Sequence, residues 1–431
     1  MIQNNRNVIN SIRDFILKKV PTFQGILTWT LISSIIALCV GASSALFLAS
    51  LHWATDFREA HKIIILALPV VGLLIGIFFY WWGKDIEAGN NLIIDNIHKP
   101  KKIIPFKMAP FILIGTVLTH LFGGSAGREG TAIQMGGAIA DQFTRFFKLS
   151  KRNRQIILIA GMSAGFGSVF GTPLAGAIFG LEVYRIGKLK YDAIFAAFVS
   201  AVLADFVTTS LGIHHTHYVI ELVPDMNLMH LLISIVAGIC FGIAATSFSK
   251  LTHQINAWGK QLIKLPYLRP VIGGIIVVGA VYLLGTHRYI GLGVPTIVES
   301  FSVQQPGYDF ALKILLTAIT LGMGFKGGEV TPLFFIGATL GSALSFVLPL
   351  PVGLLAGMGF VAVFAGASNT PLASSIMAIE LFGVECGAYV AIACVVSYLI
   401  SGHSGIYGSQ VIGEPKIFSK LKDTGKRLKE L

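Results

Sequence analysis

The sequence predicts an all-α membrane protein that crosses the bilayer many times. Of its 431 residues, 54% are hydrophobic and 13% are charged, whereas an average soluble domain has about 25% charged residues. Apolar runs near the ~20 residues needed to cross a bilayer recur along the chain. These runs are 26–53, 63–82, 156–181, 228–248, 271–284 and 388–400. We expect helices there, since backbone groups in lipid must bond to one another within the segment.

Both ends of the chain are polar and basic. Residues 1–20 have no apolar core or small-residue cleavage site, so we expect an amphipathic surface segment rather than a signal peptide. Residues 413–431 form a basic tail. Because basic segments beside spans stay inside, both ends should face the cytoplasm of the inner (plasma) membrane, near anionic headgroups. The net charge is +12, but its basic residues flank spans, so no nucleic-acid partner is expected.

The sequence contains no motif that predicts a cofactor. Four cysteines lie in apolar surroundings without metal-ligand spacing and are interpreted as small buried hydrophobic residues. They are Cys39, Cys240, Cys386 and Cys394. The stretch His214-His215-Thr216-His217 has enough imidazoles for a metal. A solvated polar loop is the favoured interpretation of that stretch.

Glycine and proline interrupt the apolar sequence in two places. Residues 330–379 contain no charged side chain but many glycines and prolines, and residues 155–181 have the same texture. Such stretches predict short helices joined by turns, which membrane proteins tolerate only where the backbone is buried or lines a cavity. Gly-x-x-x-Gly pairs fit either close helix packing or the general abundance of glycine. The pairs are Gly72/Gly76, Gly161/Gly165 and Gly176/Gly180.

The stretch 123–131 places one carboxylate, Glu129, between glycines in the middle of a chain built for lipid. A charge at membrane depth costs roughly 2.5 kcal/mol or more and is usually kept for an ion or proton pathway. The apolar residues from Thr131 to Ala140 predict a helix whose N-terminal N–H groups favour an anion. This pattern indicates anion transport.

The chain also resembles itself at long range, which predicts a duplicated unit. Gly124, Gly127, Glu129 and Thr131 recur as Gly324, Gly327, Glu329 and Thr331. Residues 172–175 recur as residues 370–373, and each copy has a glutamate nine residues after its proline, Glu182 and Glu380. The predicted repeats cover about 26–215 and 226–407. We expect Glu182 and Glu380 to mark interfaces or helix contacts.

Four motifs resemble the CLC family of chloride channels and proton-coupled anion antiporters. They occur in the same order along the chain as in the family. In that order they are Gly89–Leu92, Gly127-Arg128-Glu129-Gly130, Gly327–Pro332 and Tyr407. The resemblance implies a transmembrane domain over residues 21–412, with tilted and broken helices in two inverted repeats. It also implies a homodimer with one pathway per subunit.

Departures from the chloride type resemble the fluoride-exporting CLC-F clade. Thr131 replaces a proline, Asn90 replaces a serine, and the triplet Glu329-Val330-Thr331 replaces an Ile-Phe-Ala type of triplet. Val183 stands where chloride antiporters keep an inner proton-accepting glutamate, although Glu182 is adjacent. The implied function is a fluoride/proton antiporter that exports fluoride through the lipid bilayer, and not an enzyme.

The resemblance implies a role for each site residue. Glu129 is the gating and proton-coupling carboxylate, and Glu329 is a second proton or anion group. The expected anion-binding residues are Asn90, Val330, Thr331, Tyr407, Gly130 and Thr131. A small, hard anion needs N–H and O–H donors to replace its water, and Asn90, Thr331 and Tyr407 carry such donors, whereas Val330 has only its backbone N–H.

Structural interpretations of the same residues stay open. Arg128 is either a cation beside Glu129, a structural ion-pair partner or a side chain that reaches the interface. Thr331 also fits a helix N-cap, and Asn90 a turn residue beside Gly89. Lys326 offers Glu329 a structural ion pair.

Two other functions compete with fluoride export. One is a chloride or nitrate transporter or channel of the same family. The remote one is an intramembrane serine hydrolase, because Gly161–Gly165 matches the Gly-x-Ser-x-Gly pattern around Ser163. That pattern needs a strand-to-helix elbow and a positioned histidine, whereas Ser163 lies in an apolar run of small residues.

Overall fold

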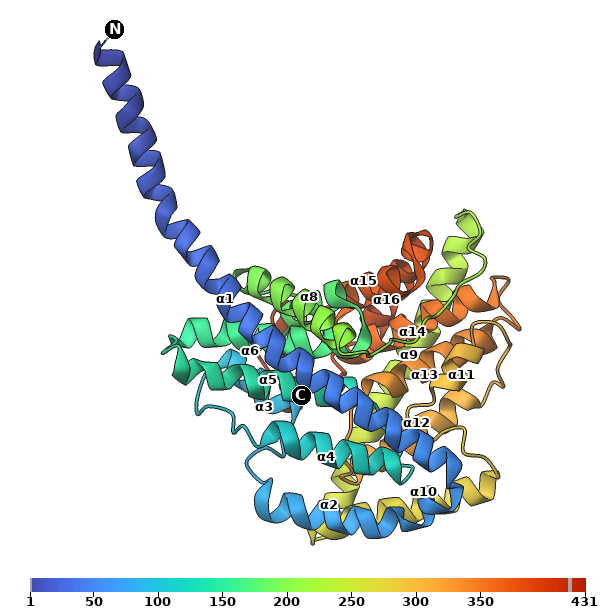
Figure 1. Cartoon of the computed structure of the whole chain (residues 1–431). Helices are drawn as coiled ribbons and strands as arrows, with labels where there is room; N and C mark the ends of the chain where they lie inside the picture. The colour runs from blue at the N-terminus through green and yellow to red at the C-terminus, as the bar shows by residue number, and fades with distance from the viewer. Residues whose placement is uncertain (1, 418–420) are drawn as a thin grey trace.

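The computed structural model of the chain is built from sixteen α-helices and describes residues 2–417 and 421–431, without the side chains of 2–22 and 421 (Figure 1). The first eight are α1 (Ile2–Ala60), α2 (Leu68–Trp82), α3 (Asn90–His98), α4 (Met108–Leu121), α5 (Glu129–Phe146), α6 (Lys151–Phe170), α7 (Pro173–Glu182) and α8 (Ile194–Ser210). The next eight are α9 (Leu228–Leu262), α10 (Arg269–Leu284), α11 (Val294–Glu299), α12 (Asp309–Gly322), α13 (Val330–Leu344), α14 (Val352–Ser368), α15 (Pro371–Phe382) and α16 (Gly387–Ile400).

Short elements join or follow these helices. The 3₁₀ turns are η1 (Lys62–Ala67), η2 (Tyr191–Ala193), η3 (Pro266–Leu268), η4 (Val384–Cys386), η5 (Leu421–Asp423) and η6 (Leu428–Glu430). Two short strands, β1 (Arg185–Ile186) and β2 (Val411–Ile412), pair in parallel. They attach the segment after Tyr407 to the connection between α7 and α8.

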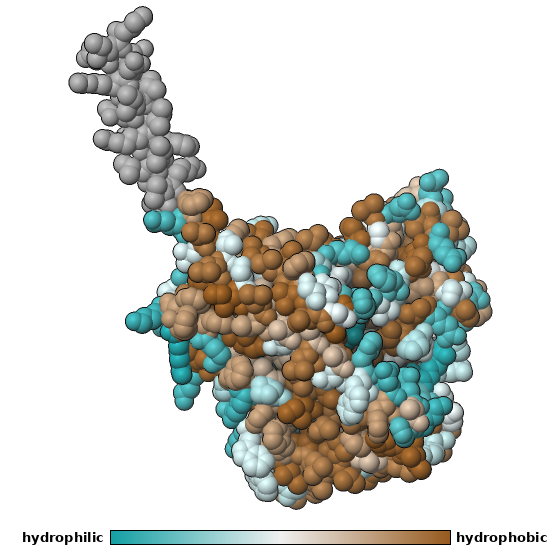
Figure 2. Space-filling view, in the orientation of Figure 1, coloured by the Kyte–Doolittle hydropathy of each residue, from teal (hydrophilic) through white to brown (hydrophobic). Residues whose placement is uncertain are grey.

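The expected membrane-crossing character is confirmed. Five described segments are long and apolar enough to cross a bilayer. They are Phe23–Ala60, Lys62–Trp82, Tyr191–Ser210, Leu228–Leu262 and Pro266–Leu284. Hydrophobic residues cover most of the face seen in Figure 2, as expected where helices meet lipid rather than water.

The two halves of the chain repeat one packing pattern. Helix α5 packs on α6 as α13 packs on α14, and α1 packs on α8 as α9 packs on α16. Across the halves, α2 meets α10 and α7 meets α15. In Figure 1, α5 and α6 lie on one side of the molecule and α13 and α14 on the other. The predicted duplication is therefore present in the packing.

The helix breaks occur at equivalent places in the two halves. Between α6 and α7 the chain turns at Gly171 with φ +76°, and between α14 and α15 it turns at Asn369 with φ +58°. Glycine and asparagine are the residues that adopt this left-handed conformation most readily. Pro173 and Pro371 then start the next helices, where a missing N–H costs nothing. The interruptions predicted within 155–181 and 330–379 are thus confirmed.

Glycine also allows close helix packing, as one interpretation of the Gly-x-x-x-Gly pairs predicted. A Cβ on Gly72 would lie 2.8 Å from the Pro270 carbonyl oxygen. A Cβ on Gly165 would lie 2.3 Å from the Ala132 carbonyl oxygen. A side chain at either position would push the helices apart.

Glu182 and Glu380 make reciprocal contacts between the halves. The carboxylate of Glu182 accepts hydrogen bonds from the N–H groups of Leu372 (3.1 Å) and Ala373 (2.9 Å), at the start of α15. The carboxylate of Glu380 accepts from Leu174 (2.9 Å) and Ala175 (2.7 Å), at the start of α7. Each glutamate thus satisfies free N–H groups at the N-terminus of the other half's helix. The expected helix contacts are confirmed.

The N-terminal residues extend helix α1, and the C-terminal tail packs against the protein. Residues 2–20 belong to α1, but their side chains lie outside the described part, so the amphipathic surface segment stays a prediction. In the tail, the Lys416 ammonium is buried and donates to Asn369 Oδ1 at 2.6 Å. Arg427 and Lys429 lie beside Asp95. The buried Lys416 therefore binds the protein rather than headgroups, and for the other basic residues of the tail a position near headgroups stays a prediction.

The structure also places the histidines and cysteines that the sequence offered as metal ligands or as buried residues. Within the described residues no group of three potential metal ligands occurs. His215 Nε2 instead lies 3.4 Å from Asp205 Oδ1. Cys386 and Cys394 are buried as expected, but Cys39 is exposed on α1. An apolar run does not distinguish a lipid-facing position from a buried one, which is why the expectation for Cys39 was wrong.

Candidate functional site

The loops before α5 and α13 bond directly to each other. The N–H of Gly127 donates to the Gly328 carbonyl at 2.6 Å, and the N–H of Gly328 donates to the Gly127 carbonyl at 2.8 Å. A Cβ on Gly127 would lie 2.8 Å from Pro332 Cδ. A Cβ on Gly328 would lie 2.7 Å from the Gly130 nitrogen. Glycine therefore allows the N-termini of two broken helices, one from each half, to meet.

Glu129 crosses this junction from one half to the other. It begins α5, two residues earlier than the sequence predicted, and its side chain is fully buried. Its Oε2 accepts from the Thr331 backbone N–H at 3.0 Å. The Thr331 hydroxyl lies 2.6 Å from Oε2 and 2.9 Å from Oε1 and donates to the carboxylate. The carboxylate thus occupies the place at the N-terminus of α13 that an anion would favour.

Arg128 and Thr331 take roles that the sequence left open. Arg128 Nε lies 3.6 Å from Glu129 Oε1, so the interpretation as an ion-pair partner fits the structure. Thr331 is not the N-cap of α13, because Glu329 holds that position and Thr331 lies inside the first turn. Its hydroxyl is thereby free to bond across to the carboxylate of the other half.

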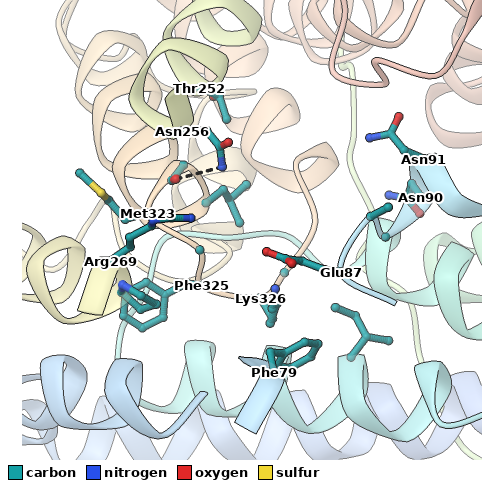
Figure 3. Close-up of a pocket in the computed structure, with 18 of the residues that line it drawn as sticks. Phe79, Glu87, Asn90, Asn91, Thr252, Asn256, Arg269, Met323, Phe325 and Lys326 are labelled. Atoms are coloured by element: carbon teal, nitrogen blue, oxygen red, sulfur yellow. Dashed lines mark hydrogen bonds between the residues drawn. The ribbon is translucent and has the colours of Figure 1, made fainter. Parts of the chain in front are cut away.

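A cavity of about 1010 Å³ opens beside this junction, and Figure 3 shows Asn90 at it. Glu329 and Tyr407 also line it. Asn90 is the first residue of α3, and Tyr407 lies in the loop after α16. A Cβ on Gly130 would lie 3.2 Å from Asn90 Nδ2 and 3.4 Å from Glu329 Oε2. The side chains of α3 and of the α13 loop therefore converge on the first turn of α5.

Three buried polar atoms at this cavity lack a partner. Among the described residues, no group hydrogen-bonds to Asn90 Oδ1, Glu329 Oε2 or Tyr407 Oη. Buried polar atoms are rarely left unpaired unless water or a ligand reaches them. Asn90 Oδ1 and an ionised Glu329 accept hydrogen bonds, so water in the cavity would satisfy them, whereas the Tyr407 O–H can donate to an anion.

The cavity is lined by more cations than anions. Its basic residues are Lys84, Lys260, Arg269 and Lys326, and its acidic residues are Glu87 and Glu329. Figure 3 shows Lys326 between Glu87 and Phe79, and its ammonium lies 4.2 Å from the centre of the Phe79 ring. A cleft lined by one sign of charge raises the local concentration of the opposite ion. The cavity therefore attracts anions.

The alternative ion pair between Lys326 and Glu329 is not formed. No described residue makes a salt bridge with Glu329, and Lys326 instead packs its ammonium over the Phe79 ring. The two residues are three positions apart, but the helix begins only at Val330. The spacing that brings side chains together on a helix does not apply before its start.

Three other positions that the sequence singled out are absent from the cavity lining. Val330 is buried at the start of α13. The Thr131 hydroxyl pairs with the Thr116 hydroxyl at 2.7 Å. Val183 is buried, and its carbonyl accepts from Gln410 Nε2 at 2.7 Å. Anion binding at Val330 and Thr131 stays a prediction.

The sequence interpretation missed part of the cavity lining. Asn91 lines it next to Asn90, and Lys260 and Arg269 reach it from the end of α9 and the start of α10. The only sequence signal for these two basic residues is their position in the polar interval 249–270, between the apolar runs 228–248 and 271–284. No sequence motif contains these two residues, because a basic side chain can contribute charge to the cavity without a fixed local pattern around it.

The fold and the site together define a class of protein. Two duplicated halves bring broken helix ends to one buried carboxylate beside a basic cavity, an arrangement typical of anion transporters. The family model for voltage-gated chloride channels matches residues 71–402. The chain belongs to this family, the CLC family.

Relatives agree with this assignment. A protein of Pseudomonas syringae pv. tomato described as a chloride/fluoride channel protein is 54% identical over 394 residues, covering 90% of this chain and 87% of its own. A crystal structure described as a CLC-type fluoride/proton antiporter is 36% identical with a TM-score of 0.86, covering 89% of this chain and 98% of its own. A slow cyanobacterial Cl⁻/H⁺ antiporter, 20% identical with a TM-score of 0.76 over 86% of this chain and 94% of its own, shares the fold.

Family membership overturns the hydrolase alternative. Ser163 lies in the middle of α6, fully buried, with its hydroxyl 3.4 Å from the Ala177 carbonyl. A nucleophile elbow needs its serine exposed at the end of a strand. The glycines around Ser163 serve helix packing instead.

Proposed function

We propose that this chain exports fluoride across the cell membrane in exchange for protons, with Glu129 as the gating and proton-coupling carboxylate. The likeness to a fluoride/proton antiporter of known structure supports the substrate and the exchange. The name of the Pseudomonas relative, which includes fluoride, supports the substrate as well. The proposed unit is a homodimer with both termini in the cytoplasm.

The contact between Glu129 and Thr331 carries this proposal. When Glu129 is ionised, its carboxylate accepts both donors of Thr331 and blocks the anion position. Protonation removes the charge that the helix N-terminus and Arg128 favour, so the side chain leaves. The anion then takes the same donors. One position that holds either a carboxylate or an anion links proton uptake to anion movement.

The donors around this position suit fluoride. A small anion loses much hydration energy on burial, and hydrogen bonds must replace it. Asn90, Thr331 and Tyr407 carry side-chain donors, Val330 contributes only a backbone N–H, and Gly130 and Thr131 let the α5 backbone approach closely. Glu329 would carry a proton or shape the inner half of the route, because its carboxylate lines the cavity.

The competing function is chloride transport or a channel without protons. The name of the Pseudomonas relative includes both chloride and channel. Chloride is larger and more weakly hydrated than fluoride, so it needs fewer donors. In a channel, Glu129 would not need to gain and lose a proton each time an anion passes.

Flux from liposomes that contain the purified protein separates these functions. We expect fluoride efflux with opposite proton movement, followed by internal pH, and little chloride flux. Comparable chloride flux would overturn the choice of substrate. Fluoride flux without proton movement would make the protein a channel.

A single substitution tests the role of Glu129 in the same assay. Glu129→Gln keeps the size of the side chain but cannot ionise, so a fluoride gradient should no longer drive protons. Glu59→Gln is the matched control, because that carboxylate is 60% exposed at the end of α1. Proton movement that persists in Glu129→Gln and equals the control would remove Glu129 from the coupling step.

A further inference from the structure

The last residues of the tail fold back on the loop that carries Tyr407. The N–H of Leu428 donates to the Gln410 carbonyl at 3.0 Å, and the N–H of Lys429 donates to the Gly408 carbonyl at 2.9 Å. Arg427 also forms a β-bridge with Val411. Residues 427–429 therefore run along the backbone directly after Tyr407.

The same residues hold α3 through Asp95. Arg427 Nη1 lies 3.3 Å from Asp95 Oδ1, and Lys429 Nζ lies 3.5 Å from Asp95 Oδ2. Lys429 Nζ also donates to the Ser409 hydroxyl at 3.1 Å. One lysine thus joins α3 to the Tyr407 loop, and Asp95 accepts two cations from the tail.

A further hydrogen bond joins the same two elements near the cavity. Asn91 Oδ1 accepts from the Ser409 backbone N–H at 2.8 Å. Asn91 follows Asn90, and Ser409 lies two residues after Tyr407. Asn90 and Tyr407 both line the cavity with buried polar atoms that no other described residue bonds. The distance between these two groups therefore depends on how α3 and the Tyr407 loop are held.

We propose that Arg427 and Lys429 act as a clasp on Asp95 that sets the position of Asn90 relative to Tyr407. The three charged residues are positioning residues, since none lines the cavity. The proposal rests on the proposed function, because its effect is on anion binding and coupling at the inner end of the path. It assigns the tail a role in transport rather than in membrane attachment.

The clasp is a sum of weak contacts. The exposed fractions of the side chains are 26% for Arg427, 46% for Lys429 and 32% for Asp95. Partly exposed ion pairs contribute little singly and are screened by salt. Loss of both pairs should change the fluoride KM by about threefold, as expected for two such pairs. Folding should be nearly unaffected.

Substitutions on the two sides of the contact test the clasp. Asp95→Asn, and Arg427→Gln with Lys429→Gln, should each raise the fluoride KM about threefold and lower the number of protons moved per fluoride. All three changes together should add nothing, because they remove one interaction. Arg427→Lys keeps the positive charge, so this variant should retain most of the coupling that the glutamine variants lose. Lys188→Gln is the control, since its pair with Glu414 (2.9 Å) joins the tail to the body elsewhere.

The proton-to-fluoride ratio is the decisive readout, because misfolded protein lowers flux without changing the ratio. A wild-type ratio and KM in Asp95→Asn and in the tail variant would overturn the clasp. If the wild-type protein itself moves no protons, the proposed function fails instead. If a variant does not fold, the wild-type protein can be tested with an impermeant gluconate salt on the side of the tail, because salt screens the two ion pairs. The salt should then shift the fluoride KM and the proton-to-fluoride ratio as the substitutions would. A KM and a ratio that salt leaves unchanged would also overturn the clasp.

Discussion

Thr331 offers the site two hydrogen-bond donors, and Glu129 now accepts both of them. A bond to a charged group contributes about 1.5–3 kcal/mol. Removing the Thr331 hydroxyl would therefore weaken the binding of the Glu129 carboxylate at this position and also the binding of an anion there. The two losses have opposite effects on the apparent fluoride affinity, because a weaker hold on Glu129 makes it a weaker competitor of the anion.

Thr331→Val should lower fluoride affinity by about tenfold or more when Glu129 is also replaced by Ala, because the anion then binds without competition. In the native background the change should be smaller. Calorimetric titration of fluoride in detergent measures both. Thr339→Val is the control, since that buried hydroxyl on the same helix donates to the Phe335 carbonyl. Equal affinities in the Thr331 and Thr339 variants would contradict the role of Thr331.

Glu329→Gln should slow fluoride exchange by about a hundredfold if its carboxylate passes protons, the typical contribution of a proton-transfer group. Its Oε2 is buried and accepts no hydrogen bond from a described residue, so no donor of the protein has to be displaced when a proton binds there. Glu87→Gln removes an exposed carboxylate from the same cavity and should change exchange little. Exchange and coupling at the wild-type level in Glu329→Gln would remove it from the mechanism.

At the scale of elements, glycine pairs bring α5 onto α6 and α13 onto α14. A Cβ on Gly136 would lie 2.1 Å from the Gly161 carbonyl oxygen. In the second half a Cβ on Gly337 would lie 1.9 Å from the Gly359 carbonyl oxygen. The contacted atoms are backbone, so they cannot rotate away as a side chain would. The same crossing in both halves holds α5 and α13 against their neighbours.

Gly337→Ala should destabilise the protein by about 1–3 kcal/mol, since the added methyl group forces α13 from α14. Thermal unfolding in detergent, followed by loss of the folded gel-filtration peak, measures the change. Gly279→Ala on α10 is the control, because nothing lies within 4 Å of its Cβ position. There alanine should be neutral or stabilising through its higher helix propensity. A Gly337→Ala protein as stable as the control would contradict this crossing.

For the whole molecule, α9 relates the cavity to the two sides of the membrane. This helix is long and apolar enough to cross, and residues near its C-terminal end, including His253 and Lys260, line the cavity with Tyr407. The tail packs on the Tyr407 loop. The loop 211–227 precedes the other end of α9. If α9 crosses the bilayer, the tail and this loop lie on opposite sides, and this is the orientation we expect.

A cysteine at an exposed position on each side tests this orientation. In a chain whose own cysteines are replaced, Lys422→Cys should react with a membrane-impermeant maleimide only from the cytoplasmic side. Glu221→Cys, in the loop 211–227, should react only from outside. Labelling of whole cells and of inverted vesicles measures both positions. Reaction of both from one side would contradict the orientation.

Much of the site was predictable because its residues stand in local motifs. Glycines around Glu129, the repeat at Glu329 and Thr331, and the motif at Asn90 are visible as short patterns. The clasp was not predictable, because Asp95 and Lys429 are joined only by folding. The basic cavity was missed for the same reason, since its cations come from the turn after α2, from α9, from α10 and from the loop before α13.

The sequence by itself determined that the chain is helical, membrane-spanning and duplicated, because hydropathy, glycine and proline act within a few residues. It also pointed to Glu129 as the carboxylate of an anion path. Only the tertiary structure decided that Glu129 accepts its hydrogen bonds from Thr331 of the other half and that Lys326 does not pair with Glu329. These outcomes depend on where two helix ends meet, and that meeting is set by packing between the halves.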